Sequence, residues 1–236
     1  FEMLPLDVTS DESVEAAVRE VLRLEGRIDL LVNNAGFSIA PAGAEESSME
    51  QARSIFETNF FGIVRMTRAG VPHMRRQGGG RIVNIGSVSG RLATPFTGPY
   101  SASKFAMEAL TDALRIELRP WKIDVAIVEP GSVATPIWEK AQAMADEIEA
   151  QLSPEGRALY GGAIKALRAF ADETAKRGIP AAEVAKAVTH ALTAKKPKTR
   201  YVVGFDASIQ AKLGKFAPDR MRDGLIARQL KLPKKA

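Results

Sequence analysis

Cysteine is absent from this chain of 236 residues, and histidine occurs only twice, as His73 and His190. Without cysteine there are no disulfides and no thiolate metal sites, and two histidines alone do not predict a zinc site. No apolar run approaches the length that spans a bilayer, and the N-terminus has no signal-peptide pattern. We therefore expect a metal-free protein in the cytoplasm.

Aromatic residues make up only 6% of the chain and are not interleaved with its basic residues, which argues against a nucleic-acid partner. The net charge of +5 is spread along the sequence, with small clusters at residues 195–198 and 231–235. Such charge is typical of solvated surface, and it would also attract a phosphorylated cofactor or an anionic membrane surface. With 45% hydrophobic residues and no linker rich in Pro, Gly or Ser, the chain is expected to form one domain over residues 1–236.

Apolar stretches typical of strands alternate with stretches of helical periodicity. This alternation predicts an α/β fold with a Rossmann-like, doubly wound parallel sheet in a three-layer α/β/α arrangement. Capping boxes are predicted at Thr9-x-x-Glu12 and Ser47-x-x-Glu50. The predicted strands are residues 3–8, where Pro5 favours an irregular or edge position, 28–32, 81–86, 124–128 and 201–203, and the longest predicted helices are 48–77 and 100–119.

Tyr100 and Lys104 lie four residues apart, directly after Pro99, which suits a helix start. Both side chains should project from one helix face, where the ammonium would stabilise the phenolate and lower the tyrosine pKa from about 10. Ser87 follows a buried strand, so its hydroxyl is expected at the strand's carboxyl end. The three groups suggest proton transfer to or from a carbonyl or alcohol oxygen that the serine holds. Taken alone, a Tyr-x-x-x-Lys pair also arises by chance on surface helices.

Four features each follow a different predicted strand: Asp7, the turn 33–36, Ser87 and the pair Pro130-Gly131. A parallel sheet gathers the carboxyl ends of its strands along one edge, which is where open α/β sheets bind ligands. Each feature has a simpler explanation when taken singly, as a turn cap or a helix start. Their coincidence on one edge predicts a binding site there.

These residues, in this order, resemble the short-chain dehydrogenase/reductase family over essentially the whole chain. The resemblance implies reversible hydride transfer between NAD or NADP and an alcohol or ketone. By this resemblance Tyr100 is the acid/base, Lys104 holds the nicotinamide ribose and tunes Tyr100, and Ser87 positions the substrate oxygen. The matching residues are Leu6-Asp7-Val8-Thr9, Asn33-Asn34-Ala35-Gly36, Asn59, Ser87, Tyr100-x-x-x-Lys104 and Pro130-Gly131-x-Val133-x-Thr135.

The same resemblance implies roles for the other matching residues. Asn59 would support a water-linked proton path to the lysine, although a solvent-facing or kinking helix residue is the plainer interpretation. Asp7 and Val8 would flank the adenine of the cofactor. The residues that would pack beside the cofactor are Asn34, Ala35 and Gly36, and those that would cradle its nicotinamide amide and diphosphate are Pro130, Gly131, Val133, through its backbone, and Thr135.

The glycine-rich turn that opens the family's fold has no counterpart here, because the chain starts in what should be the third strand. A β-α-β unit needs about 30 residues or more, so we expect roughly 40 to 50 residues to precede Phe1 in the full protein. The residue that distinguishes NAD from NADP belongs to that unit, and only the basic composition favours NADP. A membrane anchor in the absent segment also stays open.

Residues 132–178 are long for a connection and take the place of the family's substrate lid, with apolar side chains that suggest a lipophilic alcohol or ketone. The stretch 200–207, together with Leu213, Pro218-Asp219-Arg220 and Leu232-Pro233, is similar to hydroxysteroid and retinol dehydrogenases, which suggests steroid-, retinoid- or lipid-like substrates. Ordinary core or oligomer packing explains the same residues nearly as well. The apolar lid residues are Ile137, Trp138, Met144, Leu152 and Tyr160.

Two other functions fit the same pattern. One is a ketoacyl-carrier-protein reductase with the same machinery, and the other is a catalytically silent nucleotide-binding or scaffold protein. The long helices 48–77 and 100–119 are where members of the family form dimers and tetramers, so we expect a homodimer or homotetramer.

Overall fold

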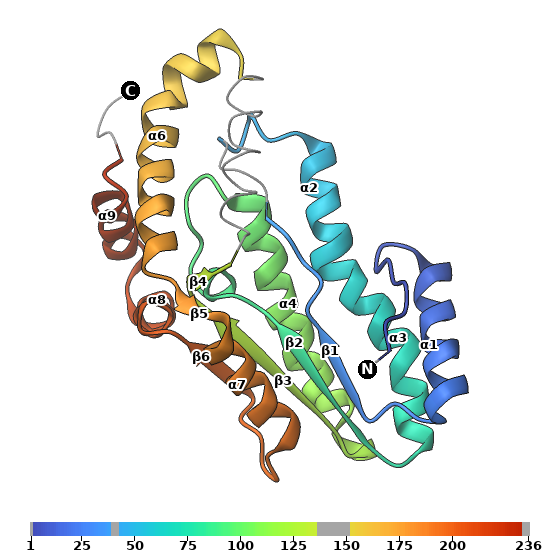
Figure 1. The fold of residues 1–236 in the computed structure, drawn as a ribbon. Coiled ribbons are helices and arrows are strands. Elements are labelled where there is room, and N and C mark those ends of the chain that lie inside the picture. The colour runs from blue at the N-terminus through green and yellow to red at the C-terminus, as the bar shows by residue number, and fades with distance from the viewer. Residues whose placement is uncertain (1, 39–42, 136–151, 233–236) are drawn as a thin grey trace.

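A four-stranded parallel sheet organises the residues that the computed structural model describes, which are 2–38, 43–135 and 152–232. The sheet has the order β1-β2-β3-β6 (Figure 1). Its register pairs Asn33 with Asn84 and Val128 with Tyr201, so the carboxyl ends of the strands lie along one edge. The strands are β1 (Leu30–Asn33), β2 (Gly80–Ile85), β3 (Ile123–Pro130) and β6 (Arg200–Val203).

Helices cover both faces of this sheet, as the predicted three-layer fold requires (Figure 1). On one face α3 (Gly62–Arg76) and α4 (Gly98–Glu117) pack on alternate strand residues. On the other face α7 (Ala181–Thr193) packs on the residues between them. The first core contains Leu31, Ile82, Val125, Met74 and Leu114, and the second contains Val83, Ala126, Val128, Ala191 and Tyr201.

The predicted helix 48–77 consists of three pieces. It begins as α2 (Met49–Phe56), passes through the π-helical turn η1 (Glu57–Phe61) and continues as α3. A π-helical turn adds a residue to the helix and turns the following side chains, and such turns are frequent at functional sites. Here the turn carries Asn59, which is completely buried.

The predicted strand 3–8 is wrong. Residues 2–7 form no strand, because no other described strand pairs with them and Pro5 has no N–H to donate. The segment instead leads into α1 (Asp11–Glu25).

Both predicted helix caps are one residue too early. Ser10 caps α1 by accepting from Ser13 N at 3.1 Å, whereas Thr9 bonds to Asp7. Ser48 forms the capping box of α2 with Gln51. In each case two neighbouring hydroxyl residues precede the helix, and the pattern of residue types alone does not distinguish them.

The segment predicted as a lid has well-defined ends. Strand β4 (Val133–Ala134) pairs in parallel with β5 (Ile179–Pro180), and α6 (Pro154–Lys176) lies between them in the chain. Ile137, Trp138 and Met144 lie outside the described residues. The remaining elements are η2 (Val88–Gly90), η3 (Arg119–Trp121), α8 (Phe205–Phe216) and α9 (Asp219–Gln229). No helix in the described parts of the chain has the length and apolar character needed to cross a membrane.

Candidate active site

Ser87 lies directly after β2, at the start of the short 3-10 helix η2. Its hydroxyl accepts a hydrogen bond from Ser89 N at 3.1 Å, which caps η2 and orients the side chain. The Ser87 side chain also lies close enough to the Tyr100 phenol to lower its pKa. The structure thus brings together the serine and the tyrosine that the sequence places on different elements.

Tyr100 and Lys104 project from the first turns of α4, with Pro99 in its first turn as predicted. Lys104 Nζ lies 5.8 Å from the centre of the Tyr100 ring and donates to Ile85 O at 3.1 Å. The lysine is only 5% exposed. Because an ammonium has three N–H donors and the described residues supply this one hydrogen-bond acceptor, Lys104 can donate further hydrogen bonds to hydroxyl groups of a ligand.

Burial favours the neutral forms of both the Lys104 amine and the Tyr100 phenol. It lowers the pKa of Lys104 to about 8 and raises the pKa of Tyr100, against a smaller lowering by the nearby Ser87 hydroxyl. The predicted fall of the tyrosine pKa is therefore wrong in net direction, because burial outweighs the stabilisation of the phenolate. Tyr100 keeps its proton at neutral pH, which is the form that can donate one.

Asn59 holds the turn after β1 against α4. Its Oδ1 accepts from Phe37 N at 3.0 Å, and its Nδ2 donates to Phe37 O at 2.9 Å and to Ser103 Oγ at 3.1 Å. Ser103 Oγ in turn donates to Tyr100 O at 2.7 Å. The interpretation of Asn59 as a solvent-facing residue is thus wrong. Ser103, which the sequence reasoning missed, is fully buried three residues after the tyrosine.

The turn Asn34-Ala35-Gly36 is exposed at the carboxyl end of β1. A methyl group on Gly36 would stand 3.1 Å from Asn59 Oδ1 and 3.7 Å from Lys104 Nζ, so glycine keeps the approach to the ammonium open. An accessible backbone turn beside a buried cation suits the hydroxyl and phosphate groups of a dinucleotide. These residues therefore fit a nicotinamide cofactor.

Hydrogen bonds with residues of β6 and α8 hold the turn that follows β3. Gly131 N donates to Val203 O at 2.9 Å, and Ser132 N donates to Asp206 Oδ2 at 3.1 Å. Val133 lies in β4 two residues later, and Thr135 is half-buried. The turn thus stands at the same edge of the sheet as Ser87, which the register of β2 and β3 requires.

Residues 1–146 match the model of a protein family described as short chain dehydrogenase. The chain belongs to this family. This result confirms the family, the Rossmann-like fold and the class of oxidoreductases that act on alcohol or ketone groups with NAD or NADP. The roles of individual residues of this short-chain dehydrogenase stay predictions.

Two relatives and one solved structure show the similarity in detail. A 3-ketodihydrosphingosine reductase of Bacteroides thetaiotaomicron is 45% identical over 134 residues, which are 56% of this chain and about half (49%) of that protein. An NADPH-dependent 3-dehydrocapnine reductase of Ornithobacterium rhinotracheale is 34% identical in an alignment 238 residues long, which covers 98% of this chain and 81% of that protein. A short-chain dehydrogenase/reductase from Burkholderia phymatum in complex with NAD superposes with a TM-score of 0.74 at 26% identity, over 89% of this chain and 73% of that one.

Asp7 and Val8 lie apart from the contacts described so far. Asp7 is exposed, and its carboxylate accepts from Thr9 N at 2.9 Å and Thr9 Oγ1 at 2.7 Å, which lowers its pKa. Val8 packs closely on Gly62 of α3. Their contact with an adenine in this short-chain dehydrogenase therefore stays a prediction.

A buried ionic cluster behind the site was not predicted. Glu129, at the end of β3, and Glu108, one turn after Lys104, lie 3.2 and 3.0 Å from Arg200 Nε. Arg91, which follows η2, reaches Glu129 Oε1 at 3.4 Å. Burial and the neighbouring Glu129 raise the pKa of Glu108 to about 7. No local pattern in the sequence distinguishes Glu129 from an acidic residue on solvated surface near a strand end.

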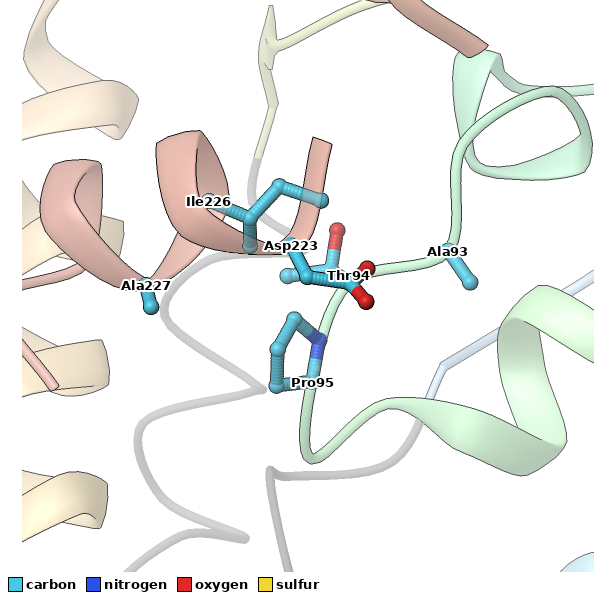
Figure 2. A pocket seen from close by; sticks show the side chains of 6 residues that line it. All are labelled: Ala93, Thr94, Pro95, Asp223, Ile226 and Ala227. Atoms are coloured by element: carbon cyan, nitrogen blue, oxygen red, sulfur yellow. The ribbon is translucent and has the colours of Figure 1, made fainter. Parts of the chain in front are cut away.

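A cavity of about 310 Å³ opens between α9 and the loop that connects Ser87 with Tyr100 (Figure 2). Neither of these two residues lines it, so the cavity lies beside the loop and not at the candidate reacting groups. Its lining consists of Ala93, Thr94, Pro95, Asp223, Ile226 and Ala227.

The predicted lid contacts the loops on both sides of the site. Phe96, in a left-handed conformation with φ of 65°, meets the ring of Tyr160 from α6 edge to face, with 6.0 Å between ring centres. The Tyr160 hydroxyl donates to Glu45, which follows β1 in the chain. These contacts place an apolar lid residue next to the segment that leads to Tyr100.

Proposed function

We propose that this chain is part of an NADPH-dependent reductase that converts the 3-keto group of a long-chain lipid base into an alcohol. The observation that carries the proposal is the meeting of Ser87, Tyr100 and a buried Lys104 at the carboxyl edge of the sheet. The names of the two relatives support the substrate class, since both describe reduction of a 3-keto or 3-dehydro compound. The name of the second supports NADPH as the cofactor.

In this reaction Ser87 and Tyr100 bind the substrate oxygen. The nicotinamide cofactor, when bound, supplies a hydride to the carbonyl carbon. Tyr100 donates its phenolic proton to the oxygen, and Ser87 stabilises the negative charge that develops there. Lys104 stabilises the phenolate that Tyr100 becomes, and the proton lost is replaced from solvent, so the alcohol gains one hydride and one proton.

The chain's own residues suggest where the cofactor is held. Lys104 would donate hydrogen bonds to the ribose hydroxyls, with Asn34, Ala35 and Gly36 beside it. Pro130, Gly131, Val133 and Thr135 would hold the nicotinamide amide and diphosphate, and Asp7 and Val8 the adenine. Asn59 would act on the proton path through the position of Lys104, next to Gly36.

The lid suggests an apolar substrate. Leu152 is buried, and Tyr160 packs on Phe96 next to the loop of the site. Apolar walls of this kind recognise hydrocarbon chains, because their burial is driven by the hydrophobic effect. An acyl thioester on a carrier protein would need a basic docking surface in addition.

A substrate panel tests the proposal on the full-length enzyme. We expect oxidation of NADPH with 3-ketodihydrosphingosine, little oxidation of NADH, and much slower turnover of an acetoacetyl thioester. Preference for the thioester would support the ketoacyl-carrier-protein reductase instead. Tight nucleotide binding by calorimetry without turnover of either ketone would support the silent nucleotide-binding protein.

The assembly and location are part of the same proposal. Apolar side chains stand exposed on the helices where a homodimer or homotetramer is expected, with Ile116 of α4 71% exposed and Phe105 44% exposed. Sedimentation velocity of the full protein tests this assembly. The proposed compartment is the cytoplasm.

A further inference from the structure

Helix α8 buries small side chains and exposes large apolar ones. Its inner face carries the small residues Ala207 and Ala211, which pack on Val88 of η2. Its outer face carries Phe205 and Phe216, which are 83% and 72% exposed. A helix at the surface of a water-soluble protein normally buries its large apolar residues.

The outer residues form one narrow stripe. Phe205, Ile209, Lys212 and Phe216 follow each other at spacings of four, three and four residues, which places all of them on one side of a helix. Ile209 is 51% exposed. The inner face of α8 has no room for larger side chains, because even a methyl group on Gly214 would stand 2.2 Å from Arg91 O. The helix therefore cannot rotate to bury the aromatic stripe instead.

The charges on and beside the stripe are basic. Lys212 lies within it, and Lys215 Nζ lies 5.1 Å from the centre of the Phe216 ring. The acidic residue among the twelve residues of α8, Asp206, binds Ser132 N and so belongs to the turn after β3. Residues 205–232 contain six basic and three acidic residues, and α9 exposes two further apolar side chains, Met221 and Leu225.

We propose that α8 docks on the surface of an anionic lipid bilayer. Apolar side chains flanked by lysines are the pattern that binds in the headgroup region, where the rings are buried among acyl chains and the ammonium groups meet lipid phosphates. The occupant is a bilayer and not an acidic protein, because two of the most exposed side chains of the stripe are phenylalanines and lysines stand beside them. The proposal rests on α8 alone and does not depend on the proposed reaction.

Docking of α8 would bring the candidate site close to the membrane. The inner face of α8 lies on η2, which begins directly after Ser87, and a helix is roughly 10 Å thick. A long-chain substrate that partitions into the bilayer would then be concentrated near the loop between Ser87 and Tyr100. Docking through the stripe would thus hold the enzyme at the membrane in which such a substrate is dissolved.

Cosedimentation of the full-length protein with vesicles tests this proposal. We expect binding to phosphatidylcholine vesicles that contain phosphatidylserine, and weaker binding at high salt because the lysines contribute. The double variant Phe205→Ser, Phe216→Ser should bind roughly tenfold or more weakly, since two large apolar side chains are lost from the contact. The charge variant Lys212→Glu, Lys215→Glu should lose the preference for phosphatidylserine.

A matched control removes two exposed apolar side chains elsewhere, Leu24→Ser and Met49→Ser, and should bind as the native protein does. Circular dichroism of every variant shows whether the fold is kept. Absence of binding by the native protein, or equal binding by the Phe205 and Phe216 double variant, would overturn the proposal. Loss of self-association by that variant in sedimentation velocity would also overturn it, because the stripe would then be an interface between two copies of the chain.

Discussion

Burying an ammonium group costs free energy, and the buried ammonium of Lys104, next to Tyr100, destabilises the folded protein in this way. Its pKa is lowered from 10.5 to about 8, which corresponds to about 3 kcal/mol of destabilisation when the group is charged. The folded protein releases this proton near pH 8, whereas the unfolded chain holds it up to about pH 10.5. The cost is therefore present in full below pH 8 and disappears as the pH rises to 10.5.

Replacing Lys104 with Met should stabilise the fold while removing most turnover. Urea unfolding at pH 7 is expected to show a gain of about 1 to 3 kcal/mol, and the gain should vanish near pH 10.5. A variant less stable than the native chain at pH 7 would show that the hydrogen bond to Ile85 O outweighs the burial.

Glu108 gives the opposite dependence on pH. Its pKa in the folded protein is raised from 4.5 to about 7, so its contribution to stability is complete below pH 4.5 and is lost as the pH rises through 7. The variant Glu108→Gln should therefore flatten the fall of unfolding free energy between pH 5 and 8 by about 1 to 2 kcal/mol. Glu117→Gln, exposed on the same helix, should leave the slope unchanged.

The sequence placed Ser87, Tyr100 and Lys104 correctly because each follows a local rule: a strand end, a helix start and a spacing of four residues. The polar groups of the core follow no local rule. Asn33 Nδ2 donates to Asn84 Oδ1, and Asn84 Nδ2 donates to Thr111 Oγ1, each at 2.8 Å. Such bonds join residues far apart in the chain, so only the tertiary structure reveals the partners.

At the scale of elements, the π-helical turn decides where Asn59 points. A regular helix from 48 to 77 was predicted, because the periodicity of apolar residues on either side of the turn is undisturbed. Within this turn, two hydrogen bonds hold the Asn59 side chain on the backbone of Phe37, 22 residues earlier in the chain. Secondary structure that depends on a distant side chain in this way cannot be derived from local pattern.

Truncation of Asn59 tests this connection. Asn59→Ala leaves the N–H and C=O of Phe37 without their side-chain partner and should cost about 2 to 4 kcal/mol of stability. It should also raise the KM for the cofactor, since the turn at Gly36 loses its support. Of the hydrogen bonds of Asn59, Ser103→Ala removes only the one from Nδ2 to Ser103 Oγ and keeps both bonds to Phe37. It should have a smaller effect on both quantities, and an equal effect would contradict the assigned role.

The small sheet of β4 and β5 shows a further limit of sequence patterns. Each strand has two residues, and Gly178 lies so close to Ala134 that a methyl group there would stand 2.7 Å from Ala134 N. Periodicity needs longer stretches to be recognised. The two short strands at the ends of the lid are therefore not among the strands that the sequence predicts.

On the scale of the whole molecule, four elements of the site meet at one ionic cluster. Arg91 comes from the loop after Ser87, Glu108 from α4, Glu129 from β3 and Arg200 from β6. The alternation of strands and helices was sufficient to predict that these elements share an edge of a parallel sheet. The ion pairs between these elements were not predictable, because a charged residue near a strand end is as typical of solvated surface as it is of a buried ion pair.

The sheet is not covered equally along its width. Leu30 and Val32 of β1 are 50% and 39% exposed, whereas Val83 and Ala126, on the strands that α7 covers, are buried. The face of β1 on the side of α7 therefore lacks a covering layer in the described residues, and this edge of the sheet is the least protected part of the core.

The proton transfer by Tyr100 is the central claim, and steady-state oxidation of NADPH with 3-ketodihydrosphingosine tests it directly. Tyr100→Phe should lower kcat at least about a thousandfold with an unchanged fold, since the proton donor is lost. Tyr201→Phe removes the hydroxyl of a buried tyrosine away from Ser87, bonded to His190 at 2.9 Å, and should leave kcat nearly unchanged. A Tyr100→Phe enzyme that turns over at a near-normal rate would contradict the account.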